Sequence, residues 1–259
     1  MNLRSFIRKC VEATGYTISK LPTSVTADTP YDQDGLNTIH NHDFMNDPAF
    51  CAAYDRGCKA AEDYHWHWRV HIGLWVAHAA GKLEGDFVEC GVNRGFLSSA
   101  IMQYLDWNSQ NRTFYLLDTF GGLNEKYLSE EDRKREALVK EDRKWDGDFY
   151  VRDVETVKAN FSQWKNVQII QGPVPETLDQ VKTQKVAYVH IDMNCSPPEV
   201  AALRFFWDRL TPGGFVLFDD YAYRGYRSQK QALDEVAKEK GVMIASIPTG
   251  QGVLIKPAR

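Results

Sequence analysis

A strand that runs into a glycine turn and then a helix constrains this chain more than any other feature. Residues 87–95 read Phe-Val-Glu-Cys-Gly-Val-Asn-Arg-Gly, so an apolar strand ends in a turn with glycine at positions 91 and 95. Glycine at the head of a parallel strand lets the backbone pass close to a ligand. The spacing is Glu-x-Gly-x-x-x-Gly, which differs from the Gly-x-Gly-x-x-Gly of dinucleotide-binding enzymes. The turn therefore predicts a small-molecule site and argues against a nicotinamide-dependent oxidoreductase.

From residue 85 onward, apolar segments alternate with amphipathic ones. Strands are expected at residues 86–90, 113–117, 167–171, 186–191, 215–218, 242–247 and 253–255, and helices at 96–105, 151–163, 198–209 and 228–240. Continuous apolar strands separated by amphipathic helices are typical of a parallel sheet that is covered on both faces. The sequence therefore predicts an α/β, Rossmann-like fold with a central, mostly parallel seven-stranded sheet.

The first 84 residues have a different texture, and we expect them to form an N-terminal helical extension to a ligand-binding domain at residues 85–259. One helix is expected at residues 3–11 and another at 64–80, and a third begins at Pro48 with Asp47 as its N-terminal cap. Residues 16–43 are expected to form a loop. The extension is expected to contribute to a substrate pocket and to the interface of a homo-oligomer, a dimer. The basic face of residues 3–11 leaves contact with a membrane surface open.

Composition limits the class of protein. With 43% hydrophobic residues the chain is able to bury a core, and its net charge of −4 argues against nucleic acid as a partner. Five scattered cysteines without a Cys-x-x-Cys pair indicate free thiols in a reducing compartment, so a cytoplasmic location is expected. No apolar run approaches the ~18 residues of a transmembrane segment, and residues 1–20 lack the apolar centre of a secretory signal.

Further acidic and glycine positions follow the strands at the sheet edge where ligands bind. Glu89 is placed to hold an ammonium group, and Asp118, at the end of the second strand, to accept hydrogen bonds from ribose hydroxyls. The turn after the third strand is placed against an adenine ring, and no phosphate-binding Gly-Lys-Ser/Thr is present. These features predict S-adenosylmethionine as the ligand. The candidate cofactor-binding residues are Glu89, Gly91, Asn93, Gly95, Asp118, Thr119, Gly172 and Val174.

Three more carboxylates, Asp192, Asp219 and Asp220, end neighbouring strands. They repel one another unless a cation lies among them, and oxygen ligands suit Mg²⁺, Ca²⁺ or Mn²⁺. Such an ion orients a substrate hydroxyl and lowers its pKa. His190 precedes Asp192 on the same strand face, either as a proton relay or as a buried structural histidine. We therefore expect a metal site at these carboxylates, with His190 as a catalytic candidate beside it.

A charged segment separates the second and third strands. Residues 129–144 contain opposite charges spaced four apart, which predicts a solvated helix. Because this segment follows Asp118, the insertion near residues 120–148 is also a candidate for a mobile lid over the site.

The ordered set of motifs resembles the macrocin-type, metal-dependent class I O-methyltransferases of antibiotic sugar biosynthesis, together with the related aminocoumarin sugar methyltransferase. The resemblance covers about residues 85–257 and rests on segments 87–92, 118–123, 171–178, 190–192 and 210–221. It implies a class I methyltransferase fold with S-adenosylmethionine at the glycine turn and Asp118. It also implies Mg²⁺ on the three carboxylates, and Asp192 as the general base.

The chain departs from that family just after the implied base. The family tends to read Asp-x-Asp-x-Tyr, whereas this chain reads Asp-Met-Asn-Cys-Ser from residue 192, so Asn194 keeps an oxygen ligand and removes a charge. We expect a Mg²⁺-assisted O-methyltransferase that uses S-adenosylmethionine to methylate a hydroxyl of a sugar or glycosylated small molecule. A metal-independent methyltransferase on another small molecule and a non-catalytic nucleoside-binding protein remain alternatives. The candidate substrate-binding residues are Tyr64, Asn194, Tyr221 and Arg224.

Overall fold

The computed structural model describes residues 7, 10, 11, 13, 14, 30–135 and 149–258, and the chain divides into two compact units, residues 1–43 and 44–259. The helix predicted at residues 3–11 lies largely outside the described residues, and so do residues 16–29 of the loop predicted at 16–43. In the first unit, β1 (Tyr31–Gln33) pairs antiparallel with β2 (Leu36–Thr38). The expectation of a loop was wrong at this hairpin. Asp34 and Gly35 supply the φ values of +50° and +71° that a two-residue hairpin turn requires.

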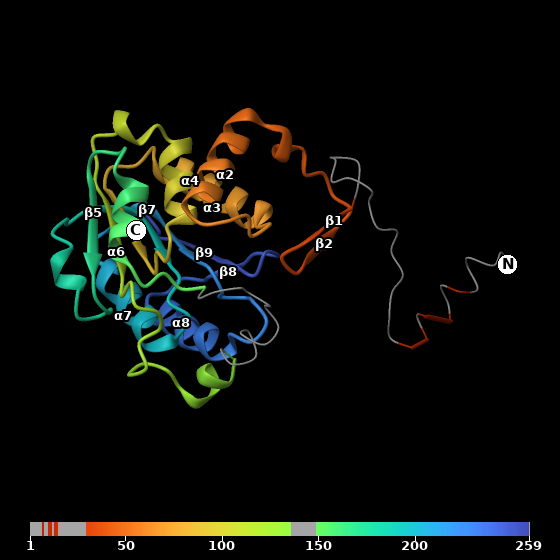
Figure 1. Ribbon diagram of the computed structural model, residues 1–259. Helices are drawn as coiled ribbons and strands as arrows, with labels where there is room; N and C mark the ends of the chain where they lie inside the picture. The colour runs from red at the N-terminus through yellow and green to blue at the C-terminus, as the bar shows by residue number, and fades with distance from the viewer. Residues whose placement is uncertain (1–6, 8–9, 12, 15–29, 136–148, 259) are drawn as a thin grey trace. The chain divides into compact units, whose positions relative to one another are not determined.

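A seven-stranded sheet forms the centre of the second unit (Figure 1). Its order is β5-β4-β3-β6-β7-β9-β8, and the pairings from β5 to β7 are parallel, whereas β9 pairs antiparallel with both β7 and β8. The chain order reverses between β3 and β6, which is where open α/β sheets bind ligands. The predicted mostly parallel sheet is thereby confirmed. Its strands are β3 (Asp86–Cys90), β4 (Phe114–Asp118), β5 (Val167–Gln171), β6 (Val186–Ile191), β7 (Leu210–Phe218), β8 (Ala245–Ser246) and β9 (Gly252–Ile255).

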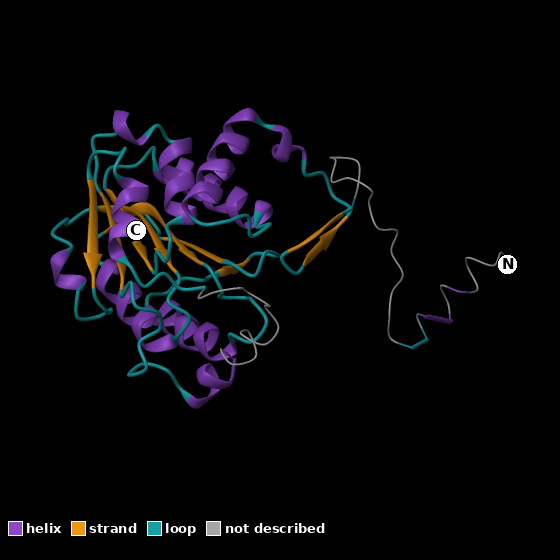
Figure 2. Ribbon diagram, viewed as in Figure 1, coloured by secondary structure: helices purple, strands orange, loops and turns teal. Residues whose placement is uncertain are grey.

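Helices cover both faces of this sheet (Figure 2). Successive strand residues enter opposite cores: Phe87 packs in the cluster that includes residues of α2, α3, α4 and α6, and Val88 packs in the cluster that includes residues of α7 and α8. Helices α2 and α3 thus belong to the second compact unit, and a functional boundary at residue 84 stays a prediction. The helices are α2 (Pro48–Ala60), α3 (His67–Ala80), α4 (Phe96–Tyr104), α6 (Val154–Phe161), α7 (Ser196–Trp207) and α8 (Arg227–Glu239), with short 3-10 helices η1 (Asp43–Asn46), η2 (Trp107–Ser109) and η3 (Leu178–Gln180).

Local chemistry explains where these elements begin and end. The Asp47 carboxylate accepts the Phe50 N–H at 2.8 Å, which confirms the predicted cap of α2. Helix α3 begins after the predicted residue 64, since His65 has a φ of +59° that a right-handed helix excludes. Strand β8 is shorter than predicted because Val242 N–H bonds the Ala237 carbonyl and closes the end of α8.

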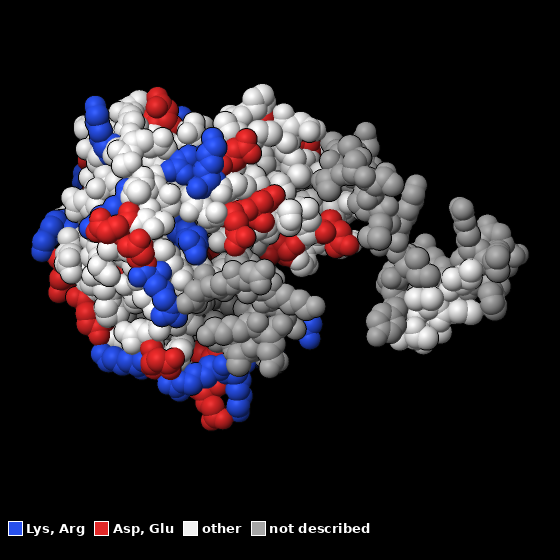
Figure 3. Space-filling view, viewed as in Figure 1, with Lys and Arg blue, Asp and Glu red and all other residues white. Residues whose placement is uncertain are grey.

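Among the described residues on the face that Figure 3 shows, acidic and basic side chains are interspersed. No helix in the described part of the chain is both long and apolar enough to cross a membrane.

Candidate active site

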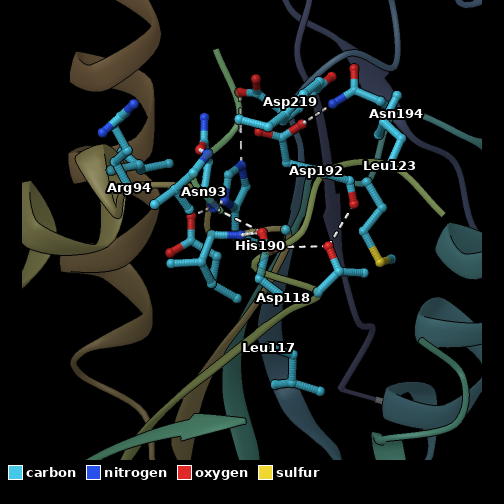
Figure 4. A pocket seen from close by; sticks show the side chains of 18 of the residues that line it. Asn93, Arg94, Leu117, Asp118, Leu123, His190, Asp192, Asn194 and Asp219 are labelled. Atoms are coloured by element: carbon cyan, nitrogen blue, oxygen red, sulfur yellow. Dashed lines mark hydrogen bonds and ion pairs between the residues drawn. The ribbon is translucent and has the colours of Figure 1, made fainter. Parts of the chain in front are cut away.

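A pocket opens at the carboxyl ends of β3, β4, β5 and β6, where the sequence analysis placed the ligand (Figure 4). Its empty space, counted together with the opening to solvent, is about 1130 Å³. Four of the predicted site residues are not among those that line the pocket. Gly95 and Asp220 are next to lining residues in the sequence, whereas Tyr221 and Arg224 are not part of the lining. The predicted residues that line it are Tyr64, Glu89, Gly91, Asn93, Asp118, Thr119, Gly172, Val174, His190, Asp192, Asn194 and Asp219.

The glycines of the turn are required by contacts within the protein. Gly91 has a φ of +92°, and a Cβ on it would lie 1.7 Å from the backbone oxygen of Asp192. Gly95 has a φ of +82° and begins α4, and a Cβ there would lie 2.5 Å from the ring of Phe161. The sequence analysis ascribed these glycines to the approach of a ligand. The structure adds that Gly91 lets the glycine turn lie directly against the candidate base.

Asp118 holds the glycine turn in place. Its Oδ2 accepts the N–H groups of Val92 and Asn93, each at 2.8 Å, and its Oδ1 accepts the Phe120 N–H at 2.7 Å. The Thr119 hydroxyl lies 3.3 Å from Asp118 Oδ1 and 2.6 Å from the Gly122 carbonyl, and its single proton goes to the nearer carbonyl. One lone-pair site of the carboxylate therefore remains for a ligand, and ribose binding by Asp118 stays a prediction.

Asn93 connects the same turn to the segment that follows the insertion. Its Nδ2 donates to the Phe149 carbonyl at 3.1 Å, and its Oδ1 accepts the Val151 N–H at 2.8 Å. The side-chain amide is thus occupied by backbone groups. Asn93 therefore shapes the pocket wall. Direct contact of its side chain with a cofactor stays a prediction, and these hydrogen bonds do not support it.

Two buried polar side chains face each other across β3 and β6. Glu89 pairs with His190 in the strand register, both are 2% exposed, and Glu89 Oε1 lies 2.8 Å from His190 Nδ1. Glu89 Oε2 is buried and has no hydrogen-bond partner among the described residues. Because an unsatisfied buried carboxylate oxygen is costly, this atom predicts a donor supplied by a ligand.

His190 is held as a cation between two carboxylates. Its Nε2 faces Asp219 Oδ1 at 3.7 Å, within ion-pair distance. Burial opposes the charged ring, but the carboxylates of Asp219 and Glu89 raise the pKa of His190 from 6.5 to about 10. A ring that is already protonated at neutral pH cannot accept a proton. The geometry therefore supports a buried counter-ion rather than a proton relay.

The three predicted metal ligands come together. Asp192, Asp219 and Asp220 each offer an oxygen atom, and these atoms lie within 4.8 Å of one another. Burial and the neighbouring carboxylates raise the pKa of Asp192 well above its usual value and that of Asp220 to about 6. A cluster of hard oxygen donors that repel one another fits Mg²⁺ or a similar divalent cation.

An arginine that the sequence analysis missed also faces this cluster. Arg69 on α3 places Nη1 2.5 Å from Asp219 Oδ2 and 3.4 Å from Asp220 Oδ1, and its guanidinium lies near the rings of Trp66 and Tyr223. Burial alone would raise the pKa of Asp219, but Arg69 and the protonated histidine hold it below its usual value. A lone arginine among the apolar residues of 67–80 was the available signal.

The loop after β6 is fixed by side chains from three other segments. Asn194 Nδ2 donates to Asp192 Oδ1 at 3.2 Å, and Asn194 Oδ1 accepts the Tyr226 hydroxyl at 2.8 Å. The Asn194 carbonyl accepts Arg135 Nη2 at 2.5 Å, and the Met193 N–H donates to Glu199 Oε1 at 3.1 Å. The sequence analysis did not identify Arg135, Tyr226 or Glu199 as part of the site.

The beginning of the charged insertion is less exposed than predicted. Ser129 and Asp132 cap the helical residues 130–135 reciprocally, and Asp132 Oδ1 also accepts Arg135 Nη1 at 2.8 Å. Asp132 and Arg135 are 2% and 8% exposed, so the prediction of a solvated helix was wrong at these two residues. The predicted Glu130–Lys134 pair forms at 2.7 Å on the surface. Residues 136–148 of the predicted lid lie outside the described part of the chain.

The predicted acceptor residues separate into two groups. Tyr64 lines the pocket, with its ring 4.4 Å from that of Trp66 and 5.5 Å from that of Phe96. Tyr221 instead bonds Lys230 and Asp234 on α8 through its hydroxyl, and Arg224 is exposed. Their positions give no support to substrate binding by Tyr221 or Arg224.

Comparisons with known proteins identify the family of the chain. A family model described as Macrocin-O-methyltransferase (TylF) matches residues 76–245. The 8-demethyl-8-(2,3-dimethoxy-alpha-L-rhamnosyl)-tetracenomycin-C 4'-O-methyltransferase of Streptomyces olivaceus is 31% identical over 148 residues, 55% of this chain and 55% of that protein. The Mycinamicin III 3''-O-methyltransferase of Micromonospora griseorubida is 24% identical over 168 residues, 60% of this chain and 65% of that protein. The matches thus span between half and two thirds of these relatives.

Solved structures show the same fold. The O-methyltransferase NovP has a TM-score of 0.61 at 21% identity, covering 73% of this chain and 79% of that chain. The calicheamicin methyltransferase CalS11 has a TM-score of 0.56 at 15% identity, covering 92% and 99%. These likenesses show a Rossmann-like α/β fold. With the family model matching most of the sequence, the chain belongs to the macrocin O-methyltransferase (TylF) family.

Proposed function

We propose that this protein transfers a methyl group from S-adenosylmethionine to a hydroxyl of a sugar or a glycosylated small molecule, assisted by Mg²⁺. The observation that carries the proposal is one pocket with two chemically distinct halves. One half contains the glycine turn and the unpaired Glu89 Oε2, and the other contains Asp192 and Asp219. The family and the names of both relatives support O-methylation, and the rhamnosyl group in the name of one relative supports a glycoside acceptor.

The first half suits the methyl donor. Glu89 Oε2 accepts a hydrogen bond from the ammonium group of the methionine moiety, because it is a buried carboxylate oxygen without a donor among the described residues. Gly172 and Val174 line the pocket after β5, where an apolar wall accommodates adenine. The remaining lone pair of Asp118 is available to a ribose hydroxyl.

The second half suits proton removal from the acceptor. The acceptor oxygen attacks the methyl carbon, a C–O bond forms, and the C–S bond breaks with its electron pair going to the sulfur. Asp192 accepts the hydroxyl proton. Alignment of the oxygen with the methyl group contributes roughly 7–11 kcal/mol when two reactants are held in near-attack geometry.

Asp192, Asp219 and Asp220 would hold the cation. When bound, it supplies the positive charge that keeps Asp192 ionised and lowers the pKa of a nearby hydroxyl. Arg69 already neutralises part of this cluster, an observation that favours the metal-independent methyltransferase as a second candidate.

The acceptor side of the pocket is aromatic. Tyr64 and Trp66 line it, and aromatic faces pack against the apolar faces of sugars. A glycoside acceptor, a homodimer and a cytoplasmic location remain parts of the proposal.

Methyl transfer from isotope-labelled S-adenosylmethionine to a panel of glycosides tests the proposal. We expect product with Mg²⁺, a loss of at least tenfold in chelator, and a loss of at least a hundredfold in Asp192→Asn. Full turnover in chelator would select the metal-independent alternative. Transfer that Asp192→Asn leaves unchanged would contradict the assigned base.

A further inference from the structure

The side chain of Asn194 lies between two partners of different chemistry. Its Nδ2 is 3.2 Å from Asp192 Oδ1, and its Oδ1 is 2.8 Å from the Tyr226 hydroxyl (Figure 4 shows Asn194 beside Asp192). Asn194 also lines the pocket. A carboxamide has one donating and one accepting end, so its orientation decides what it presents to the acidic cluster.

The partners fix that orientation. The NH₂ group of Asn194 faces Asp192 Oδ1, and this is the orientation that Asp192 requires when a bound cation keeps it ionised, because a carboxylate only accepts hydrogen bonds. The oxygen then faces Tyr226, whose hydroxyl donates. The guanidinium of Arg135 lies 4.1 Å from the centre of the Tyr226 ring, and a cation on the ring face withdraws electron density from the phenol and strengthens its O–H as a donor.

The backbone of Asn194 is held by the same arginine. Arg135 Nη2 donates to the Asn194 carbonyl at 2.5 Å, and Arg135 Nη1 pairs with Asp132 at 2.8 Å. Asn194 has a φ of +57°, a conformation that asparagine tolerates better than most residues. Its backbone and its side chain are therefore both fixed by residues far away in the sequence.

We propose that Asn194 is a positioning residue for Asp192 and that its side-chain oxygen does not bind the cation. The carboxamide holds Asp192 Oδ1 by a hydrogen bond, which leaves Oδ2 for the cation or the substrate proton. This inference rests on the proposed function for the role of Asp192. It reverses the expectation from sequence that Asn194 supplies an oxygen ligand.

Titration with Mn²⁺, followed by the electron paramagnetic resonance of the free ion, separates the two roles. We expect Asn194→Ala to keep the Mn²⁺ dissociation constant within threefold of wild type or to lower it, because no ligand is lost. Asp192→Ala, the matched control, is expected to raise it at least tenfold. A more than threefold increase in Asn194→Ala would overturn the proposal.

The hydrogen bond has a spectroscopic signature that requires neither metal binding nor an acceptor. In ¹⁵N-labelled protein, the side-chain amide of Asn194 is assigned by its disappearance in Asn194→Ala. We expect one downfield, exchange-protected proton in chelator that persists with Mg²⁺ and moves upfield in Asp192→Ala. Tyr226→Phe, which keeps the ring, is expected to broaden the signal because the amide loses its fixed orientation.

Either of two spectral results would refute the inference: an Asn194 amide signal that ignores Asp192→Ala, or one that moves to the solvent-exposed position when Mg²⁺ is added. S-adenosylhomocysteine binding is measured on the same samples. Its failure would count against the proposed function, whereas the amide signal reports on Asn194 alone.

Discussion

Gly91→Ala, compared with a control glycine, separates two destabilising effects: the clash of a Cβ with the backbone of Asp192, and the strain of a side chain at a positive φ. A Cβ at residue 91 would lie 1.7 Å from the Asp192 oxygen, whereas ordinary contact begins near 3.4 Å, so a gap of 3.4 − 1.7, about 1.7 Å, must open. Overpacking of this kind costs about 1–3 kcal/mol, and a positive φ costs a non-glycine residue about 1–2 kcal/mol. We therefore expect a loss of about 2–5 kcal/mol.

Gly241→Ala is the matched control. Gly241 also has a positive φ, +69°, but a Cβ there meets nothing within 4 Å, so only the loss of about 1–2 kcal/mol from strain is expected. Urea unfolding measures both variants, and calorimetry measures their affinity for S-adenosylhomocysteine. We expect Gly91→Ala to lose more stability and at least tenfold in affinity, and Gly241→Ala to keep wild-type affinity. Equal stability and affinity in the two variants would refute the role assigned to Gly91.

Three further predictions concern the buried charges and the insertion. Arg69→Met leaves buried carboxylates without their partner, so we expect the free energy of unfolding, measured in urea with chelator, to fall by about 3–5 kcal/mol. Mn²⁺ should restore part of this loss. An unchanged unfolding midpoint would contradict the pairing. The pKa of His190 is raised from 6.5 to about 10 by folding, so protonation of His190 stabilises the fold fully below pH 6.5, and this stabilisation is lost as the pH rises towards 10. In urea unfolding with chelator, wild type should therefore lose more stability across this window than His190→Asn. Parallel curves of stability against pH would contradict this prediction. Ser129→Ala removes the N-terminal cap of the helical residues 130–135 and should lower the free energy of unfolding in urea by about 0.5–2 kcal/mol. An unchanged midpoint would show that this cap is dispensable.

The sheet was predictable from sequence because each strand is a short apolar run bounded by turn residues. The carboxyl ends of parallel strands meet at one edge, so the positions of Glu89, Asp192 and Asp219 at strand ends sufficed to place them in one pocket. The hairpin at residues 31–38 was missed although Asp34-Gly35 is a strong turn signal.

Long-range pairings were beyond the sequence. Arg69 and Asp219 are 150 residues apart, and nothing in a single sequence says which carboxylate a helix arginine meets. Arg135 was assigned to a solvated face because its neighbours are charged, yet it is buried against Tyr226. Asp118 was interpreted as a ligand-binding group, and its bonds to the glycine turn follow from backbone geometry that residue type does not encode.

Binding of S-adenosylhomocysteine by wild type, Glu89→Gln and Glu84→Gln tests whether this pocket holds S-adenosylmethionine. Glu84 is a suitable control because it pairs with Lys185 on the surface. At 100 times its dissociation constant the ligand should stabilise wild type by about 2.7 kcal/mol. We expect the same stabilisation for Glu84→Gln and at least tenfold weaker binding by Glu89→Gln. Absence of binding by wild type, or equal binding by all three proteins, would contradict the assignment of this pocket to S-adenosylmethionine.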